Sequence, residues 1–145
     1  MNSENQPAAI DNRPKKHWQL CHDIIEVFYA VYNELGHGFL EAVYEEAIVL
    51  ALMEAGFTVA RQVPLPIWFR GKRIGEYKAD LIVNNAVLLE LKAARALDSS
   101  HEAQSLNYLR ATDIEVALLL NFGTKPHFKR FVFANERKRI RVHSR

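Results

Sequence analysis

The sequence contains very little cysteine and no long apolar segment. Cys21 is the single cysteine in 145 residues, so the chain can form no internal disulfide and no cysteine-based zinc cluster. Its apolar runs, such as Val116–Leu120, are far shorter than the roughly 20 residues that a membrane-spanning helix requires. Residues 1–16 are polar and lack the apolar region of a signal peptide. We therefore expect a cytoplasmic protein without membrane spans.

The apolar residues that are present suffice for one core. They make up 49% of the chain, which at this length fits a single compact domain. Residues 1–14 are polar, include two prolines and show no periodicity, so we expect a disordered leader there. The domain is expected over residues 15–134 and a basic C-terminal tail over residues 135–145.

Charge is distributed unevenly along the chain. The net charge is +2, but from Lys125 onward eight Lys or Arg residues accompany one acid, Glu136, which gives this segment a net charge of +7. The first 124 residues carry a net charge of −5. Such asymmetry suits a polyanionic partner such as nucleic acid. A solvated tail that only aids solubility would give the same pattern, and charge alone does not separate the two interpretations.

Hydrophobic periodicity predicts an α/β domain with a mixed central sheet flanked by helices. Two amphipathic helices, expected to form a hairpin, come first, and glycines follow each of them. Three or four antiparallel strands follow, then a helix and two more strands. The expected helices start at His17 and Leu40 and at Ser99 or Ser100, and the expected strands cover Phe57–Val63, Ile67–Arg70, Arg73–Val83, Val87–Ala93, Val116–Asn121 and His127–Phe133.

Two of these strands carry charged residues inside otherwise apolar runs. Asp80 interrupts one strand, and Glu90 and Lys92 interrupt the next. Because side chains alternate between the faces of a strand, the apolar faces of both strands match only if Leu81 lies opposite Leu89. This register requires a three-residue connection. It places Asp80 directly across from Glu90, with Cβ atoms roughly 5 Å apart.

A divalent cation would relieve the repulsion between these two carboxylates. Magnesium favours hard oxygen ligands, typically from one or two carboxylates, and keeps water molecules that can act as nucleophiles. Lys92 could then orient such a water molecule or offset charge that develops on a phosphate. The three residues alone also permit a structural interpretation, in which Asp80 and Lys92 form an ion pair at the end of the sheet and Glu90 lies in solvent.

The charged residues of these two strands, together with further blocks of the sequence, resemble a known nuclease family. Asp80 followed by Glu90-Leu91-Lys92 resembles the core motif of the PD-(D/E)XK nuclease superfamily. Residues 38–44, GFLEAVY, resemble the signature of its GxxExxY branch. The resemblance continues through about residues 24–133 in the blocks QVPLPIWFRGKRIGEYKADLIV, LLELKA, HEAQSLNYLRAT and LLLNFG.

This resemblance implies a restriction-endonuclease-like fold and a Mg²⁺ site, with Mn²⁺ as a substitute. Asp80 and Glu90 would be metal ligands, the backbone carbonyl of Leu91 a third ligand, and Lys92 the catalytic lysine. Glu41 would match the additional acid of exonuclease-like branches and would contact the metal directly or through water. Without the resemblance, Glu41 reads as a solvated helix glutamate.

Gln104 and Tyr108 lie four residues apart on a predicted helix and resemble the QxxxY motif of the same branches. Gln104 would hydrogen-bond substrate phosphate or Lys92, and Tyr108 would brace the site. Alternatively, the helix packs through its leucines and leaves both polar residues at its margin. His101 is expected to support the site only indirectly, because a lone histidine is more often structural than a ligand.

The sequence departs from the family pattern at two positions. Ala79 precedes Asp80 where the superfamily has proline, and His37 occupies a second position that is often proline. Neither position supplies a metal ligand, so the expected fold stands. His37 lies near the expected phosphate site, and its role is left open.

The function expected from these residues is Mg²⁺-dependent hydrolysis of phosphodiester bonds in nucleic acid by a metal-activated water molecule, and the resemblance to the superfamily implies DNA as the substrate. Two alternatives remain: a catalytically silent nucleic-acid-binding module, and a nuclease subunit that is active only in a complex or a homodimer. The loops Gly71–Arg73 and Phe122–Pro126 are expected to govern substrate choice.

Overall fold

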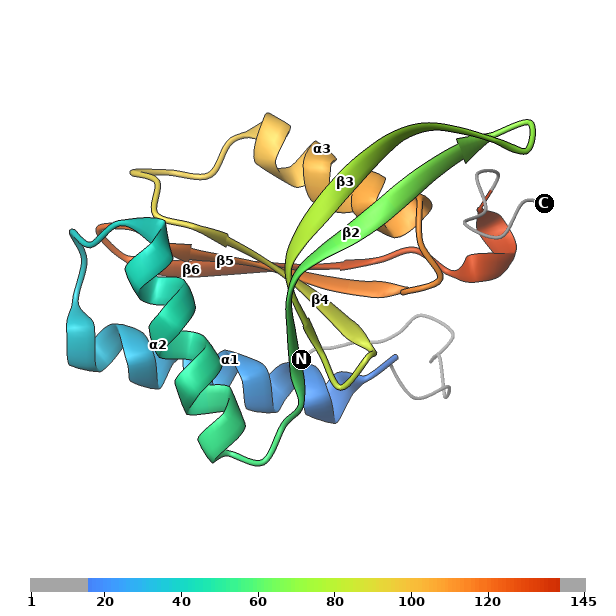
Figure 1. Ribbon diagram of the computed structural model, residues 1–145. Helices are drawn as coiled ribbons and strands as arrows, with labels where there is room; N and C mark the ends of the chain where they lie inside the picture. The colour runs from blue at the N-terminus through green and yellow to red at the C-terminus, as the bar shows by residue number, and fades with distance from the viewer. Residues whose placement is uncertain (1–15, 139–145) are drawn as a thin grey trace, which may run out of the picture.

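The structure, a computed structural model, describes residues 16–138 (Figure 1). The predicted leader lies outside these residues, as does the predicted basic tail from residue 139 onward. The described chain forms three α-helices and one five-stranded sheet. In chain order the elements are α1 (Trp18–Leu35), α2 (Glu41–Glu54), β2 (Val59–Phe69), β3 (Lys72–Val83), β4 (Val87–Lys92), α3 (Ser99–Arg110), β5 (Val116–Phe122), β6 (Pro126–Val132) and the 3₁₀ turn η1 (Asn135–Arg137).

The sheet is mixed and its strands follow the chain order from β2 to β6. Neighbouring strands are antiparallel except β4 and β5, which are parallel. A parallel pair needs a long crossover, and α3 with its flanking loops provides it. The predicted α/β fold, a mixed sheet flanked by helices, is confirmed.

Helices cover both faces of the sheet. Figure 1 shows α1 and α2 on one side of it and α3 on the other. The larger core lies on the side of α1 and α2, and the smaller core lies beneath α3. Each helix turns an apolar face toward its core, and the side chains that α1 buries are Cys21, Ile24, Phe28 and Val31. Within the described part of the chain, no helix has the length and apolar content that crossing a bilayer requires.

Strand β2 differs from the prediction of two short strands separated by prolines. It is one strand of 11 residues that contains both Pro64 and Pro66. The two prolines are two residues apart on an edge strand, so their backbone nitrogens point to the same side of it. That side can be the one facing away from β3, where no N–H group is needed for pairing. Proline therefore marks the edge of the sheet here and not a break between strands.

The connection between β3 and β4 is the predicted one. Leu81 lies opposite Leu89 and Val83 opposite Val87, which leaves a three-residue connection at residues 84–86. Asn84 and Asn85 both have positive φ angles, of 51° and 54°, a conformation that asparagine tolerates better than most residues. The register derived from the apolar pattern is confirmed.

The start of α3 corrects a second prediction. The N-cap is Asp98, and neither Ser99 nor Ser100 caps the helix. Oδ1 of Asp98 accepts hydrogen bonds from the backbone N–H groups of Ser100 and His101, at 2.9 and 3.2 Å. The backbone N–H of Asp98 donates to Nδ1 of His101 (3.2 Å), which closes a capping box. Asp98 was overlooked because two serines follow it and serine is an equally good cap.

Candidate active site

Strands β3 and β4 separate where their charged residues begin. Backbone pairing between them runs from Val83–Val87 to Leu81–Leu89. At the next position, hydrogen bonds from backbone N–H groups to carboxylates replace the backbone pairing. The N–H of Leu91 donates to Oδ2 of Asp80 (2.8 Å), and the N–H of Asp80 donates to Oε2 of Glu90 (3.1 Å). Both carboxylates are therefore held in the opening between the two strands.

A twist in the β2–β3 ribbon accompanies this separation. Leu81 packs in the core with α1 and α2, whereas Ala79, two residues earlier, packs in the core beneath α3. In a regular strand these two side chains would share one face. Gln62 lies across from Asp80 between two paired positions and has a φ of 48°, well outside the extended range. The change of face thus occurs at Asp80 itself.

The two carboxylates lie in a strongly perturbed electrostatic environment. Glu90 is only 3% exposed, and burial, followed by the negative charge of Asp80, raises its pKa to about 8. Burial also raises the pKa of Asp80, against the lowering effect of the hydrogen bond from Leu91. Without a cation, Glu90 therefore holds a proton at neutral pH.

Lys92 follows Glu90 at the end of β4 and is half-buried. Its positive charge lowers the pKa values of both Asp80 and Glu90. Among residues 16–138 it takes part in no ion pair within 4.0 Å, and no hydrogen bond involves its Nζ. The structural alternative, an Asp80–Lys92 ion pair with Glu90 in solvent, is therefore wrong.

Helix α2 contributes two acids on the side of Asp80. Glu41, the first residue of the helix, is exposed, and its charge raises the pKa values of Asp80 and Glu90. Glu45, one turn later, has a larger effect on Asp80 than Glu41 does. Its side chain is 15% exposed and accepts hydrogen bonds from Arg61 and Gln62. The sequence reasoning missed Glu45, although the spacing Glu41-x-x-x-Glu45 already places both acids on neighbouring turns.

Helix α3 brings Gln104 and Tyr108 to the site. Nε2 of Gln104 donates to the hydroxyl of Tyr108 (2.9 Å), and the Tyr108 ring lies 4.8 Å from that of Tyr77. Tyr108 is 4% exposed, and burial, followed by the charge of Glu90, raises its pKa to about 12. Tyr108 thus lies close to Glu90 and braces the core beneath α3. Gln104 contacts Tyr108, and the structure shows no bond from it to Lys92.

The remaining predicted residues lie around this centre. Leu91 is buried, and its N–H anchors Asp80. His101 closes the cap of α3, which gives it a structural role at the helix start. His37 is exposed in the loop between α1 and α2. Tyr44 is fully buried, and its hydroxyl donates to the carbonyl of Gly36 (2.5 Å) and so shapes that loop.

A family model described as the PD-(D/E)XK nuclease superfamily matches residues 18–131. The chain belongs to this superfamily. A search of curated proteins finds no match. Among solved structures, the crystal structure of SSO0001 is 15% identical, with a TM-score of 0.46 over 81% of this chain and 80% of the other, and we draw nothing from this distant likeness.

The oxygens at the centre of this PD-(D/E)XK chain fit a hard divalent cation. Oδ1 of Asp80 and Oε1 of Glu90 accept no hydrogen bond from any described residue, so each carboxylate keeps one oxygen for a ligand. A buried pair of acids with raised pKa values is the electrostatic environment that a cation would stabilise. Glu41 does not form a compact group with these two acids. Among residues 16–138, the carboxylate oxygens of Asp80, Glu90 and Glu41 do not all lie within 4.8 Å of one another.

Another set of possible ligands lies on α1, away from the PD-(D/E)XK motif. Ligand atoms of His22, Asp23 and Glu26 lie within 4.8 Å of one another. The three residues lie on one helix, and the ring of His22 is 3.7 and 4.0 Å from its two acidic neighbours. Exposed helix pairs of this kind contribute little and imply no ion.

The segment that follows the motif lysine is fixed by a second strand. Asn121 lies beside Lys92 in the parallel register. Its side chain accepts from the N–H of Ala94 and donates to the carbonyl of Ala94, both at 2.9 Å. The block NFG then continues with Phe122, whose ring stacks on Tyr44 at 4.3 Å. These contacts fix the chain that leads out of the active site.

Replacing Gly123 with alanine is expected to destabilise the protein by about 1–3 kcal/mol, the usual cost of overpacking. A Cβ at this position would lie 2.4 Å from the carbonyl oxygen of Ala94, and backbone cannot yield as a flexible side chain does. Urea unfolding followed by circular dichroism measures the loss. Gly75→Ala is the matched control, because no atom lies within 4 Å of its Cβ, and it should change stability by no more than about 0.5 kcal/mol. Equal stabilities of the two variants would contradict this packing.

Proposed function

We propose that the chain is a Mg²⁺-dependent nuclease that hydrolyses phosphodiester bonds in nucleic acid, with DNA as the principal substrate and Mn²⁺ as a substitute metal. The observation that carries this proposal is the pair of buried carboxylates, Asp80 and Glu90, cross-bonded between two separating strands beside the unpaired Lys92. Membership of a nuclease superfamily agrees with it.

Asp80 and Glu90 would hold the cation through Oδ1 and Oε1, and the carbonyl of Leu91 would complete the set of protein ligands. The hydrogen bonds to Oδ2 and Oε2 keep the two carboxylates in place without occupying these oxygens. Glu41 would act through a bridging water molecule, because it lies too far out to join a compact cluster. Glu90 would release its proton when the cation binds.

A bound divalent cation would lower the pKa of a coordinated water molecule and neutralise charge that develops on the phosphate. The ammonium of Lys92 would donate to that water molecule or to a phosphate oxygen, since it donates to no described residue. Tyr108, held by Gln104, would close the side of the site that faces α3 and exclude bulk water from Glu90.

We further place the chain in the GxxExxY branch of the superfamily. Gly38, Glu41 and Tyr44 form its signature here, and each has a physical role in keeping with it. Gly38 has a φ of 112°, which side chains rarely adopt, and Tyr44 ties its hydroxyl to the loop that contains Gly38. This loop leads directly into Glu41, whose charge raises the pKa of Asp80.

A second candidate, a nuclease subunit that acts with a partner or as a homodimer, is favoured by the outer surface of α2. Val43, Leu50 and Met53 are 41%, 60% and 59% exposed there. Such large apolar side chains grouped on one helix face are typical of protein contacts. Light scattering of the purified chain gives its oligomeric state.

Cleavage of labelled DNA in the presence of Mg²⁺, Mn²⁺ or EDTA tests the proposal directly. We expect product with either metal and none with EDTA, because the proposed reaction needs a water molecule that a bound cation activates. Parallel RNA reactions test the substrate preference. Salt-sensitive DNA binding without cleavage of either polymer would overturn the nuclease assignment and favour the silent binding module.

A further inference from the structure

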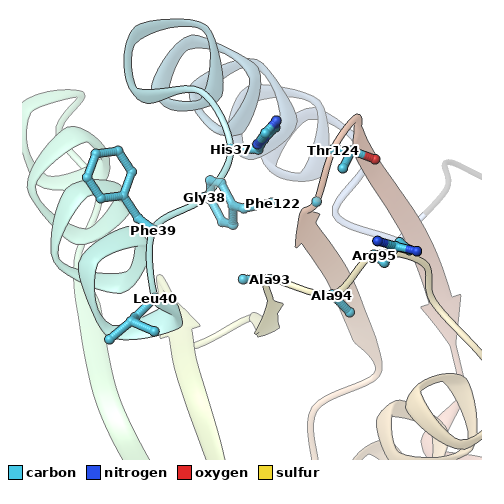
Figure 2. A pocket seen from close by; sticks show the side chains of 10 residues that line it. His37, Gly38, Phe39, Leu40, Ala93, Ala94, Arg95, Phe122 and Thr124 are labelled. Carbon is cyan, nitrogen blue, oxygen red and sulfur yellow. The ribbon is translucent and has the colours of Figure 1, made fainter.

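Two adjoining pockets lie directly beyond the active-site strand. The first, of about 380 Å³, is enclosed by the loop between α1 and α2, the segment after β4 and the turn between β5 and β6 (Figure 2). It includes Ala93, the residue after Lys92, and Leu40, the residue before Glu41. A ligand in this pocket would therefore contact the neighbours in sequence of Lys92 and Glu41.

The first pocket combines apolar surfaces with positive charge. The loop residues Phe39 and Leu40, 45% and 78% exposed, line one side of it, with the Phe39 ring directed away from Arg95, and Phe122 lies beside Gly38 in Figure 2. Arg95 lies across the pocket, is exposed and makes no ion pair or hydrogen bond with any described residue. No acidic residue lines this pocket. An exposed guanidinium beside the apolar residue Leu40 suits the phosphate and the base of a nucleotide.

The second pocket, of about 560 Å³, continues from the first because the two share Arg95 and Thr124. Its lining adds the cations Lys125 and Lys129. Its single acid, Glu102, is neutralised by Lys129 at 3.0 Å. The two pockets together form a path of positive charge that begins beside Ala93, the residue after Lys92, and passes Arg95.

We propose that this path binds a single strand of nucleic acid, with one nucleotide in the first pocket between Leu40 and Arg95 and the following phosphates along Arg95 and Lys125. This inference rests on the proposed nuclease function and names the form of its substrate. A pocket of about 380 Å³ has room for one nucleotide and none for a base pair within a duplex, whose stacked bases are closed to it. Arg95 is three residues from Lys92, so their Cα atoms are at most about 11 Å apart.

The start of α2 adds backbone donors at the edge of the first pocket. Its N-cap, Leu40, lines the pocket and offers no side-chain hydrogen bond to the helix. The N–H groups of Glu41 and Ala42 donate to no described residue. Free N–H groups at a helix N-terminus favour phosphate oxygens, which supports the same ligand.

Fluorescence anisotropy with labelled single-stranded and duplex oligonucleotides in EDTA tests the path without catalysis. Wild-type protein is expected to bind the single strand at least about tenfold more tightly than the duplex. Arg95→Ala should weaken single-strand binding and reduce the slope of log K against log salt by about 0.7, the value for one lost phosphate contact.

Arg110→Ala is the matched control, because it removes the same charge from an exposed position that lines neither pocket. It should leave the salt slope unchanged. Equal affinity for duplex and single strand, or equal slopes for Arg95→Ala and Arg110→Ala, would overturn the inference. The same measurement with single-stranded DNA and single-stranded RNA shows which of the two polymers the path binds. Since binding is measured without metal, its outcome is independent of whether the protein cleaves.

Discussion

Alanine in place of Asp80 or Lys92 is expected to lower metal-dependent cleavage of DNA by about 10²- to 10³-fold or more, the scale on which single transition-state contacts act. Asp80→Ala removes one carboxylate of the cross-bonded pair and leaves the N–H of Leu91 without its acceptor. Lys92→Ala removes the unpaired ammonium beside that pair. Initial rates of hydrolysis of a labelled oligonucleotide with Mg²⁺ measure both effects.

Two further variants separate lost chemistry from lost structure. Asp80→Asn keeps an oxygen that can accept from Leu91 but removes the charge, so it should fold as the wild type does and still fail to cleave. Asp23→Ala removes an aspartate from the cluster on α1, where metal-ligating atoms also lie close together. It should cleave at the wild-type rate. Full activity of Asp80→Asn together with an inactive Asp23→Ala would move the metal site to α1.

Glutamine in place of Glu90 is expected to stabilise the metal-free protein at alkaline pH while it abolishes metal-dependent cleavage. The folded pKa of Glu90 is raised from 4.5 to about 8, so the folded protein keeps a proton that the unfolded chain has lost. The stability that this protonated carboxyl contributes is fully present below about pH 4.5 and is lost as pH rises to about 8. Since one unit corresponds to 1.36 kcal/mol, the loss reaches at most about 5 kcal/mol.

Urea unfolding of wild type and Glu90→Gln at pH 5 and pH 9 in EDTA measures this difference. All other titrating groups are common to both proteins, so the change of the difference with pH isolates Glu90. We expect Glu90→Gln to gain several kcal/mol over the wild type between the two pH values. A difference that stays constant with pH would show that Glu90 is not the buried, proton-holding acid described here. Added Mg²⁺ should stabilise the wild type more than the variant.

The meeting of Asp80 and Glu90 could be predicted because it depends on local regularities. Strand side chains alternate with a period of two, so only one register places the apolar faces of β3 and β4 on the same side. Burial of Leu81 and Leu89 selects that register, and the two acids then have to face each other. Helix α1 was predictable for a similar reason, since its apolar residues recur with a period of 3.6.

Other features depend on contacts between distant segments and carry no local pattern. Glu45 reaches the site only because α2 packs along β2, where Arg61 and Gln62 hold its carboxylate. The prolines of β2 break no strand because this strand lies at the edge, and only the strand order reveals an edge. The cap of α3 was mispredicted because three consecutive residues could each have capped it.

By itself the sequence determined the α/β class, the register of β3 and β4 that brings Asp80 near Glu90, and the nuclease superfamily, since each depends on residue order and periodicity. The tertiary structure alone decided that β3 and β4 part at these acids, that Glu90 is buried and that Lys92 forms no ion pair with any described residue. It alone assembled the pockets around Arg95 from three separate segments. Burial and electrostatic coupling arise from neighbours far apart in the chain, and the pKa of Glu90 therefore follows from packing.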